Sequence, residues 1–421
     1  MKPKLRPLPR ALMQVALASL ILNVSPLMAA DATGSTFKKP GFYMDNFRLL
    51  PEIELMGYYD DNIYATRQSR ESDYITQLSP SLSIDSLWDV HRLALDTGAR
   101  LGRYADATSE DYDDFWLNGE GDYEFDEAHK VYAGAGYSRN HEGRDSKESG
   151  SLQIDEPTTY DVLEGQLGWQ RQVDQSSVKI GITYEQLDYD NVGSLYNDDR
   201  DRDVTGLGLR LSHDFSPDLQ LYAQGVLNQR DYVDSRDQYG YAKDSEGYNG
   251  LIGMTRRLTK GNRIDVYVGR FYQDYEDPRF EEVNDWNFGL DLRWYPTPKT
   301  QLKAQLERTQ NETTEIGSSS YLYTDWDLQI DQKLGADTVG YVGFNYGFAE
   351  FQDVGREDET RSLSLGVKYY ANPWVMLSGG LRRVDNDSND VNHVSPVQES
   401  YDFKQNLVFL NLHVRLAPKA P

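Results

Sequence analysis

Hydrophobic and polar side chains alternate one by one in many segments of the chain after about residue 50. In the clearest of these segments, 286–294, every second residue is apolar and the residues between them are polar or glycine. The same alternation recurs at 301–307, 325–331 and 362–369. A period of two residues is typical of a β-strand with one apolar and one polar face. The chain therefore predicts an all-β fold.

Two kinds of connection alternate between the predicted strands. Eight are short and rich in turn-forming residues, at 88–89, 127–128, 174–175, 216–218, 260–262, 297–298, 335–337 and 372–373. The others are longer, polar and acidic, at 60–73, 105–111, 141–157, 190–202, 233–246, 276–284, 312–321, 351–360 and 386–400. Transmembrane antiparallel up-and-down β-barrels have short periplasmic turns and long extracellular loops. We predict one barrel of about 18 strands over residues 49–416.

Aromatic residues sit where a membrane-spanning barrel would need them. Trp286 and Trp294 share the apolar face of one predicted strand, and their separation corresponds to roughly 20 Å of membrane height on a tilted strand. Trp326 and Phe115 would lie at the loop-side interface, and Trp169 at the turn side. A soluble β-protein also alternates, because one face of each sheet is buried. The persistent asymmetry between loops and turns favours the membrane barrel.

The N-terminus predicts export. Four basic residues precede an apolar run at 11–22, and the sequence Ala30-Asp31-Ala32 fits a small-residue cleavage site. The apolar run is shorter than the roughly 20 residues that a spanning helix needs. We therefore expect a cleaved signal peptide at 1–32 and a periplasmic lead-in at 33–48. The barrel follows, with a tail at 417–421, in the outer membrane of a Gram-negative bacterium.

Composition narrows the possible functions. The chain has 421 residues, no cysteine, and a net charge of −25. The absence of cysteine excludes disulfides, thiolate metal sites and cysteine nucleophiles. Nucleic acid is not an expected partner, because phosphates need a basic surface. Residues 385–389 begin like a calcium-binding loop, but Asp390 stands where the turn glycine is needed and Pro396 where the bidentate glutamate is needed. The histidines show no ligand spacing and the chain has no hydrolase signature, so we expect no metal, no cofactor and no enzymatic activity.

The first predicted loop carries a recognisable motif. Residues 59–64 read YDDNIY, and residues 72–82 read SDYITQLSPSL. This segment resembles the β-barrel porin family associated with exopolysaccharide and capsule biosynthesis clusters of Gram-negative bacteria. The resemblance implies an outer-membrane protein that takes part in exopolysaccharide export or biosynthesis. The motif consists of Tyr59, Asp60, Asp61, Asn62, Ile63 and Tyr64.

The residues of this motif also permit a purely structural role. The side chains of Asp60, Asp61 and Asn62 can start a tight turn through hydrogen bonds to the backbone. Tyr59 and Tyr64 can lie at the membrane interface. Contact with a ligand is the alternative for the whole motif.

The polar faces of the strands would line an aqueous lumen, because a barrel of 16–18 strands is wide enough for a channel. The predicted channel-lining residues are Arg92, Asp96, Arg100, Glu120, Asp122, Arg210, Tyr222, Arg230, Lys303, Asp325, Asp327 and Arg382. Both signs of charge occur together with tyrosine and amide side chains that can bind sugar hydroxyls. A register slip of one residue would reverse every assignment.

Two classes of function remain open from the sequence. The first is a pore through which a neutral or weakly acidic polysaccharide passes. The second is a structural barrel with a plugged lumen that binds matrix polysaccharide or lipopolysaccharide. A general solute porin and an outer-membrane hydrolase are more distant alternatives. Outer-membrane lipid, lipopolysaccharide and periplasmic export or synthesis proteins are the expected partners.

Overall fold

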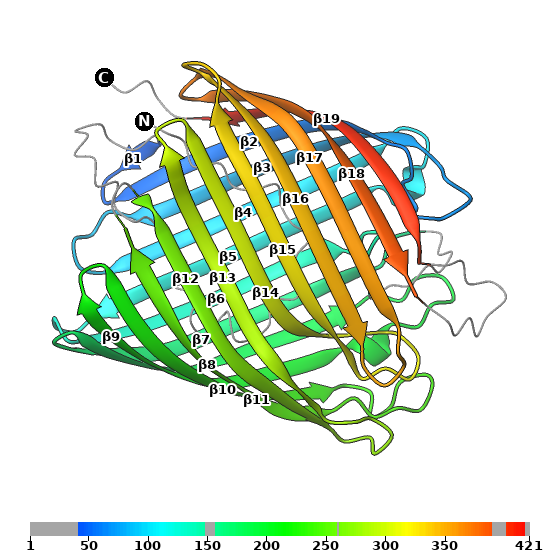
Figure 1. Cartoon of the computed structure of the whole chain (residues 1–421), viewed down its shortest axis with the longest axis horizontal. Coiled ribbons are helices and arrows are strands. Elements are labelled where there is room, and N and C mark those ends of the chain that lie inside the picture. Colours follow the sequence, from blue (N-terminus) through cyan, green and yellow to red (C-terminus); the bar gives the residue numbers. More distant parts are fainter. Residues whose placement is uncertain (1–40, 148–155, 259–260, 390–400, 417–421) are drawn as a thin grey trace.

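The computed structural model describes residues 41–147, 156–258, 261–389 and 401–416, which form one closed barrel (Figure 1). Its strands are β2 (Phe47–Asp60), β3 (Asp73–Ser86), β4 (Arg92–Tyr104), β5 (Tyr112–Glu124), β6 (His129–His141), β7 (Thr159–Val173), β8 (Ser176–Tyr189), β9 (Arg202–Ser216), β10 (Leu219–Tyr232), β11 (Ser245–Arg257), β12 (Arg263–Tyr275), β13 (Val283–Thr297), β14 (Thr300–Glu312), β15 (Ser320–Lys333), β16 (Thr338–Phe351), β17 (Glu357–Asn372), β18 (Val375–Ser388) and β19 (Phe403–Arg415).

Every strand from β2 onward pairs with the next one in antiparallel fashion, and β19 returns to pair with β2. The closing register runs from Leu407 opposite Asp60 to Arg415 opposite Glu52. Closure leaves no strand edge unpaired around the ring, which a β-structure in lipid requires because the bilayer offers no water to the backbone. The predicted all-β, 18-strand antiparallel barrel is confirmed.

Short and long connections alternate as the sequence pattern predicts. The tightest turns, 174–175, 217–218, 298–299 and 373–374, join strands at one end of the barrel, and longer loops such as 142–158 and 233–244 join them at the other. Most of the long loops are shorter than predicted; for example, β17 already begins at Glu357 and β18 continues to Ser388. In both cases polar residues belong to strand ends, where their side chains hydrogen-bond with neighbouring strands and loops. Prediction from polarity alone therefore put these loop boundaries a few residues inside the strands.

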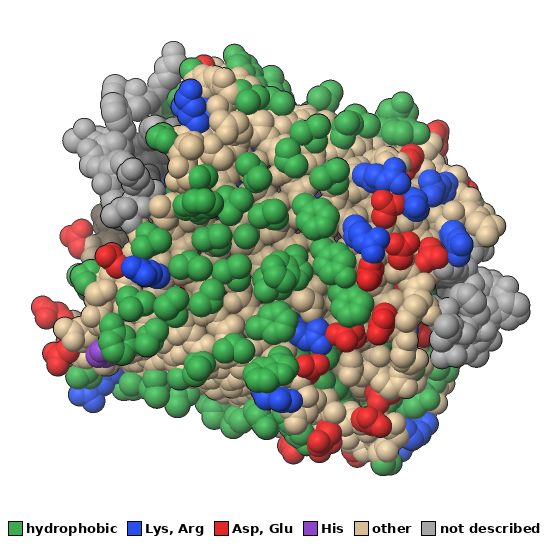
Figure 2. Space-filling view, in the orientation of Figure 1, with side chains coloured by type: hydrophobic (Ala, Val, Ile, Leu, Met, Phe, Trp, Pro, Cys, Tyr) green, Lys and Arg blue, Asp and Glu red, His purple; other side chains and the backbone are tan. Residues whose placement is uncertain are grey.

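The outer surface of the barrel is apolar. Leu207, Leu209 and Leu211 on β9 are about half exposed, as are Trp286 and Trp294 on β13. Figure 2 shows hydrophobic side chains spread across the outer face, with acidic and basic side chains gathered mainly at the long-loop end. This pattern is that of a lipid-facing band bordered by polar ends.

Only a few of the residues that precede the barrel belong to the described structure. Strand β1 (Phe42–Met44) forms a hairpin with the start of β2, from Phe42 opposite Leu49 to Met44 opposite Phe47. The predicted signal peptide and the predicted tail lie outside the described residues. Helical structure in the described part is limited to the single turns η1 (Thr108–Glu110) and η2 (Asp198–Arg200), so it includes no helix long and apolar enough to cross a membrane.

Candidate functional site

The lumen wall is the candidate site, and β4 and β5 show how it is built. Arg92, Asp96 and Arg100 share one face of β4, while Leu93 and Leu95 are exposed on the other. This alternation follows directly from the two-residue period of the strand. Other residues predicted to line the channel alternate in the same way with exposed apolar residues, as Arg210 does between Leu209 and Leu211 and as Arg382 does beside Leu381.

The charged residues of β4 and β5 are paired across the two strands. Arg92 forms an ion pair with Glu120, and Arg100 binds Asp114 at 3.2 Å. Asp96 accepts a hydrogen bond of 2.8 Å from the indole nitrogen of Trp116. The neighbouring Asp122 lies 3.4 Å from the ammonium of Lys130 on β6. This side of the lumen therefore carries both charges in close, mutually neutralising pairs.

On β9 and β10, an arginine lies flat on a tyrosine. The guanidinium of Arg210 is 3.7 Å from the centre of the Tyr222 ring, a cation–π geometry. Tyr222 reaches across β11 to donate a 2.8 Å hydrogen bond to Asp265 on β12. This reach needs the intervening Gly253, because a Cβ there would lie 2.2 Å from the tyrosine ring. Residues on alternate strands thus touch over a glycine inside the barrel.

Apart from Arg230 on β10, the remaining predicted residues lie on β14, β15 and β18. Lys303 is 3.2 Å from Asp331, and Asp325 accepts a 2.8 Å hydrogen bond from Asn345. Asp327 stands opposite Asn345 in the β15–β16 register. On β18, the guanidinium of Arg382 donates to the hydroxyl of Ser362 at 3.0 Å, and this bond links β18 to β17.

The extracellular half of the lumen is crossed by contacts between strands that are not neighbours. Arg230 on β10 lies 3.2 Å from Glu312 on β14, and Tyr232 donates to the same carboxylate at 2.7 Å. These contacts are possible because β13 and β14 stop pairing at Gly289 opposite Glu307, although both strands continue beyond that point. The β14–β15 hairpin therefore bends into the barrel at its loop end.

The bent hairpin packs on the inner wall. Leu322 joins a buried cluster with Phe271, Tyr275, Phe280 and Val283. Leu322 lies on the same face of β15 as Trp326. Nearer the short-turn end of the strand, Trp326 is exposed on the outside of the barrel. One face of the hairpin thus changes from lipid contact to packing inside the barrel. The sequence analysis missed this change because the two-residue alternation continues through it.

A loop from the opposite side also crosses the lumen. Lys147, at the described end of the β6–β7 loop, donates to the hydroxyl of Thr360 on β17 at 3.1 Å and lies 3.7 Å from Asp358. Burial lowers the pKa of the Lys147 ammonium. Beside it, Arg356 binds Asp358 at 2.7 Å and the β14–β15 loop residue Glu315 at 2.5 Å. Charged groups from three parts of the chain converge here.

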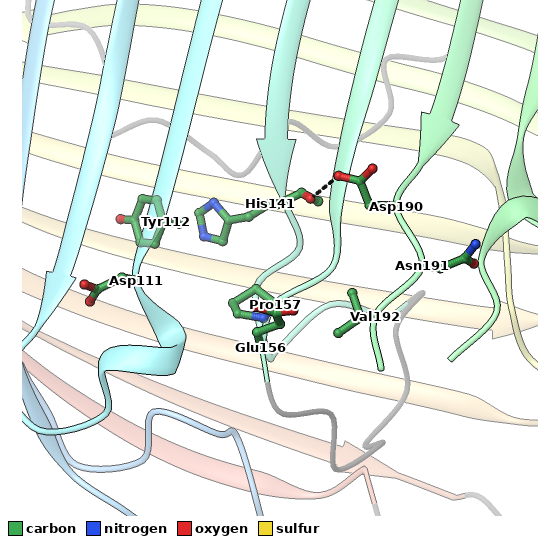
Figure 3. A pocket seen from close by; sticks show the side chains of 9 residues that line it. Asp111, Tyr112, His141, Glu156, Pro157, Asp190, Asn191 and Val192 are labelled. Atoms are coloured by element: carbon green, nitrogen blue, oxygen red, sulfur yellow. Dashed lines mark hydrogen bonds between the residues drawn. The ribbon is translucent and has the colours of Figure 1, made fainter. Parts of the chain in front are cut away.

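A cavity of about 320 Å³ lies between the loops at this end of the barrel (Figure 3). The ring of His141 stacks on Tyr112 with 3.8 Å between ring centres, and its Nδ1 is 2.7 Å from Asp114. Thr159 donates a 2.6 Å hydrogen bond to Asp190 across the cavity wall. The lining side chains are Asp111, Tyr112, His141, Glu156, Pro157, Thr159, Asp190, Asn191 and Val192. The cavity is polar and belongs to the extracellular mouth.

The Tyr59–Tyr64 motif lies at the seam where β2 meets β19. The Asp61 carboxylate accepts hydrogen bonds of 2.6 Å from both the backbone and the side-chain nitrogen of Asn406. Asp60 accepts a 2.6 Å bond from the side chain of Gln405. Residues from the first and last barrel strands are therefore joined by side chains beyond the last paired backbone position.

Asn62 is the buried centre of this seam, with no exposed surface. Its amide nitrogen donates to the carbonyls of Lys404 at 2.9 Å and Thr66 at 2.8 Å, and its own backbone nitrogen donates to Asp60. The outward Tyr59 packs against Tyr74, with 5.0 Å between ring centres. The turn that the sequence analysis expected is present, and it also closes the barrel, which no local pattern in the sequence indicates.

Two loop carboxylates have pKa values shifted in opposite directions. Burial raises the pKa of Asp201 to about 6. Hydrogen bonds from Arg279 lower the pKa of Asp277 well below its ordinary value, and Asp277 also accepts from the Ala242 backbone at 3.0 Å. Ionised Asp277 therefore stabilises the contact between two loops above about pH 4, and the contribution is lost as the pH falls below that. Asp201 has the opposite effect on stability. Because its pKa is raised, its ionisation destabilises the folded protein as the pH rises towards 6.

Within the described ranges, no three histidine or carboxylate side chains are placed to hold a metal ion. The described part of the calcium-like segment, Asp385–Asn389, instead makes strand contacts, such as Asp385 with Arg383 at 2.9 Å. What the lumen geometry offers is hydrogen bonding, aromatic surface and charge.

The barrel fold is similar to that of several solved structures. Solved structures with a similar fold include OccK2 (OpdF) of Pseudomonas aeruginosa, with 10% identity, a TM-score of 0.50, and coverage of 90% of this chain and 100% of that one. The copper transporter OprC has 11% identity and the same TM-score, with coverage of 90% and 81%. At such identities the likeness concerns the fold alone. No curated protein sequence matches the chain.

The family of the chain follows from a protein-family model and not from these distant structures. The model described as "Putative beta-barrel porin 2" matches residues 35–416, which includes every strand of the barrel. The match spans the motif at the seam and the lumen-lining strands alike. This chain is therefore a member of that family of outer-membrane β-barrel porins.

Proposed function

We propose that the barrel serves exopolysaccharide export or biosynthesis, as a pore through which a neutral or weakly acidic polysaccharide passes without an energy source. The observation that carries this proposal is the inner wall, where tyrosine, amide and charged side chains lie close together, as Tyr222, Gln224 and Arg210 do. Such groups bind sugar hydroxyls and ring faces weakly and repeatedly, and conduction requires many weak sites rather than one tight site. The resemblance of residues 59–82 to a family found beside polysaccharide genes points in the same direction.

A structural barrel that binds matrix polysaccharide or lipopolysaccharide is the second candidate. It is favoured by the bent β14–β15 hairpin and by Lys147, both of which occupy the extracellular half of the lumen. In this case the barrel would hold polymer at its mouth without passing it. We expect neither function to involve catalysis.

The two candidates differ in conductance and in secretion. We expect the purified barrel to conduct ions in planar bilayers, and maltotetraose to reduce that current reversibly. We also expect deletion of the gene to lower polysaccharide secretion, with recovery on complementation. A barrel that folds but does not conduct, in cells that secrete normally without it, would contradict the pore and leave the binding role.

A further inference from the structure

Cationic side chains line the lumen near the short turns all around the barrel, but they differ in their partners. On β19 and β2–β6 each has an acidic partner. These pairs are Arg48–Asp85, Arg92–Glu120, Lys130–Asp122 and Arg415–Glu52. Because the two charges of each pair largely cancel, they produce little net electric field in the water of the lumen. The opposite wall is different.

On β11–β14, four cations stand in one row across four neighbouring strands. Arg257 is opposite Arg263, Arg263 is opposite Arg293, and Arg293 is opposite Lys303. Like charges directly opposite each other destabilise a sheet. Of the four, Arg257 and Arg293 form no ion pair with any residue that the structure describes. Both of these side chains are exposed to the lumen.

A second group of cations lies on β8 and β9, at a different level from this row. Lys179 stands opposite Arg210, and within the described chain neither has an acidic partner within ion-pair distance. Each lies by an aromatic face, with Arg210 3.7 Å from the Tyr222 ring and Lys179 5.9 Å from the Tyr132 ring. The bond from Tyr222 to Asp265 links this group to the first row, because Asp265 is 3.8 Å from Arg263. We call the set Lys179, Arg210, Arg257, Arg263, Arg293 and Lys303 the cationic arc.

We infer that the cationic arc binds the carboxylate groups of an acidic saccharide inside the periplasmic half of the lumen. This inference rests on the proposed polysaccharide pore and names its substrate class. Guanidinium groups bind carboxylates in a bidentate geometry, and a bound anion would offset the repulsion within the row. Tyr132 and Tyr222 add aromatic surface for a sugar ring beside the cations.

Nearby acids keep the arc from holding an anion tightly. Asp265 lies beside Arg263, and Asp331 lies 3.2 Å from Lys303 and 3.9 Å from Lys368. Asp291 is two residues from Arg293 on the same face of β13. These carboxylates weaken each individual site without neutralising the arc, which suits a ligand that must move on.

The test removes the cations that have no acidic partner among the described residues. Two double variants, Arg257→Gln/Arg293→Gln and Lys179→Gln/Arg210→Gln, are compared with the wild type. The matched control is Arg171→Gln/Arg256→Gln, which removes two exposed arginines from the outward faces of β7 and β11. Each unit charge about 10 Å from an ion in water changes the local anion concentration roughly twofold. Removing two charges lowers the anion concentration about fourfold and raises the cation concentration about fourfold, so we expect the chloride-over-potassium permeability ratio to fall about sixteenfold in each arc variant and to stay unchanged in the control.

Binding is measured on the same detergent-solubilised proteins by calorimetry, which does not need an open channel. The probes are tetragalacturonate, maltotetraose and succinate. We expect tetragalacturonate to bind the wild type more tightly than the other two, and this preference to disappear in the arc variants. Equal binding of succinate would overturn the saccharide assignment. Arc variants with wild-type selectivity and wild-type binding would overturn the anion site itself.

The outcome separates this inference from the function on which it rests. Impaired secretion in the gene deletion, together with arc variants that bind and secrete normally, would remove only the cationic arc. Normal secretion in the deletion strain, together with arc variants that lose anion selectivity, would remove the export role and keep the anion site.

Discussion

A barrel closes when its last strand pairs with its first. In this protein, three consecutive side chains contribute to that pairing. Asp60, Asp61 and Asn62 bind groups on β19 or on the chain that leads into it. Unpaired backbone groups at a seam are costly near lipid, because nothing there replaces water. A buried amide such as Asn62 satisfies several of them at once, and any smaller side chain would leave them without a partner.

We expect Asn62→Ala to weaken the seam by about 2 kcal/mol, the cost of leaving buried hydrogen-bonding groups unsatisfied. The folded and unfolded forms of an outer-membrane barrel migrate differently on gels, so the temperature at which the band shifts measures the effect. That temperature should fall for Asn62→Ala. Asn118→Ala is the control, because Asn118 is an exposed lumen residue outside the seam. Equal shifts in the two variants would show that the seam does not depend on Asn62.

The β14–β15 hairpin has two environments along one face, and Arg308 lies where they meet. Arg308 is 3.0 Å from Asp285 on β13 and 2.7 Å from Glu350 on β16, and 11% of its side chain is exposed. Since β13 and β14 are no longer paired by their backbones at this level, the ion pair with Asp285 is a direct link between the hairpin and the wall that it leaves. The position of the hairpin therefore depends on side chains more than on the sheet.

We expect Arg308→Ala to cost about 3 kcal/mol locally, because it leaves two carboxylates near each other without their cation. The hairpin should then move more freely, giving larger and noisier single-channel currents and faster proteolysis at 313–319. Arg270→Ala is the control, since Arg270 is an exposed cation on β12 that contacts Asn284 and the Trp286 ring and has no acidic partner among the described residues. Unchanged currents and proteolysis would mean that the apolar cluster around Leu322 alone fixes the hairpin.

The strands and turns could be predicted from the sequence because each depends on local chemistry. The alternation at 286–294 reports which face meets lipid, and Asp174-Gln175 reports a turn, without knowledge of any other segment. The pairing of Arg230 with Glu312 could not be predicted, because it depends on a bend that leaves the alternation intact. For the same reason, Arg92 and Arg293 look alike in the sequence, although only Arg92 has an acidic partner in the described structure.

The molecule as a whole is asymmetric along its axis. The extracellular half of the lumen is packed with the hairpin, with Lys147 and with the buried cluster at Leu322, whereas Arg257 and Arg293 in the other half are exposed to the lumen. An entering polymer would thus meet a wide charged chamber on the turn side and a constriction on the loop side. Which compartment each side faces decides what the chamber and the constriction do.

We expect the long loops to face outward from the cell, because outer-membrane barrels keep short turns in the periplasm. Two glycines with left-handed backbones provide matched insertion sites, Gly240 in the loop 233–244 and Gly261 in the turn 258–262. An epitope tag at Gly240 should be labelled by antibody on intact cells. A tag at Gly261 should be labelled only after the outer membrane is permeabilised. The reverse result would invert the barrel, place the cationic arc at the cell surface, and turn the chamber from an entrance for periplasmic polymer into an exit.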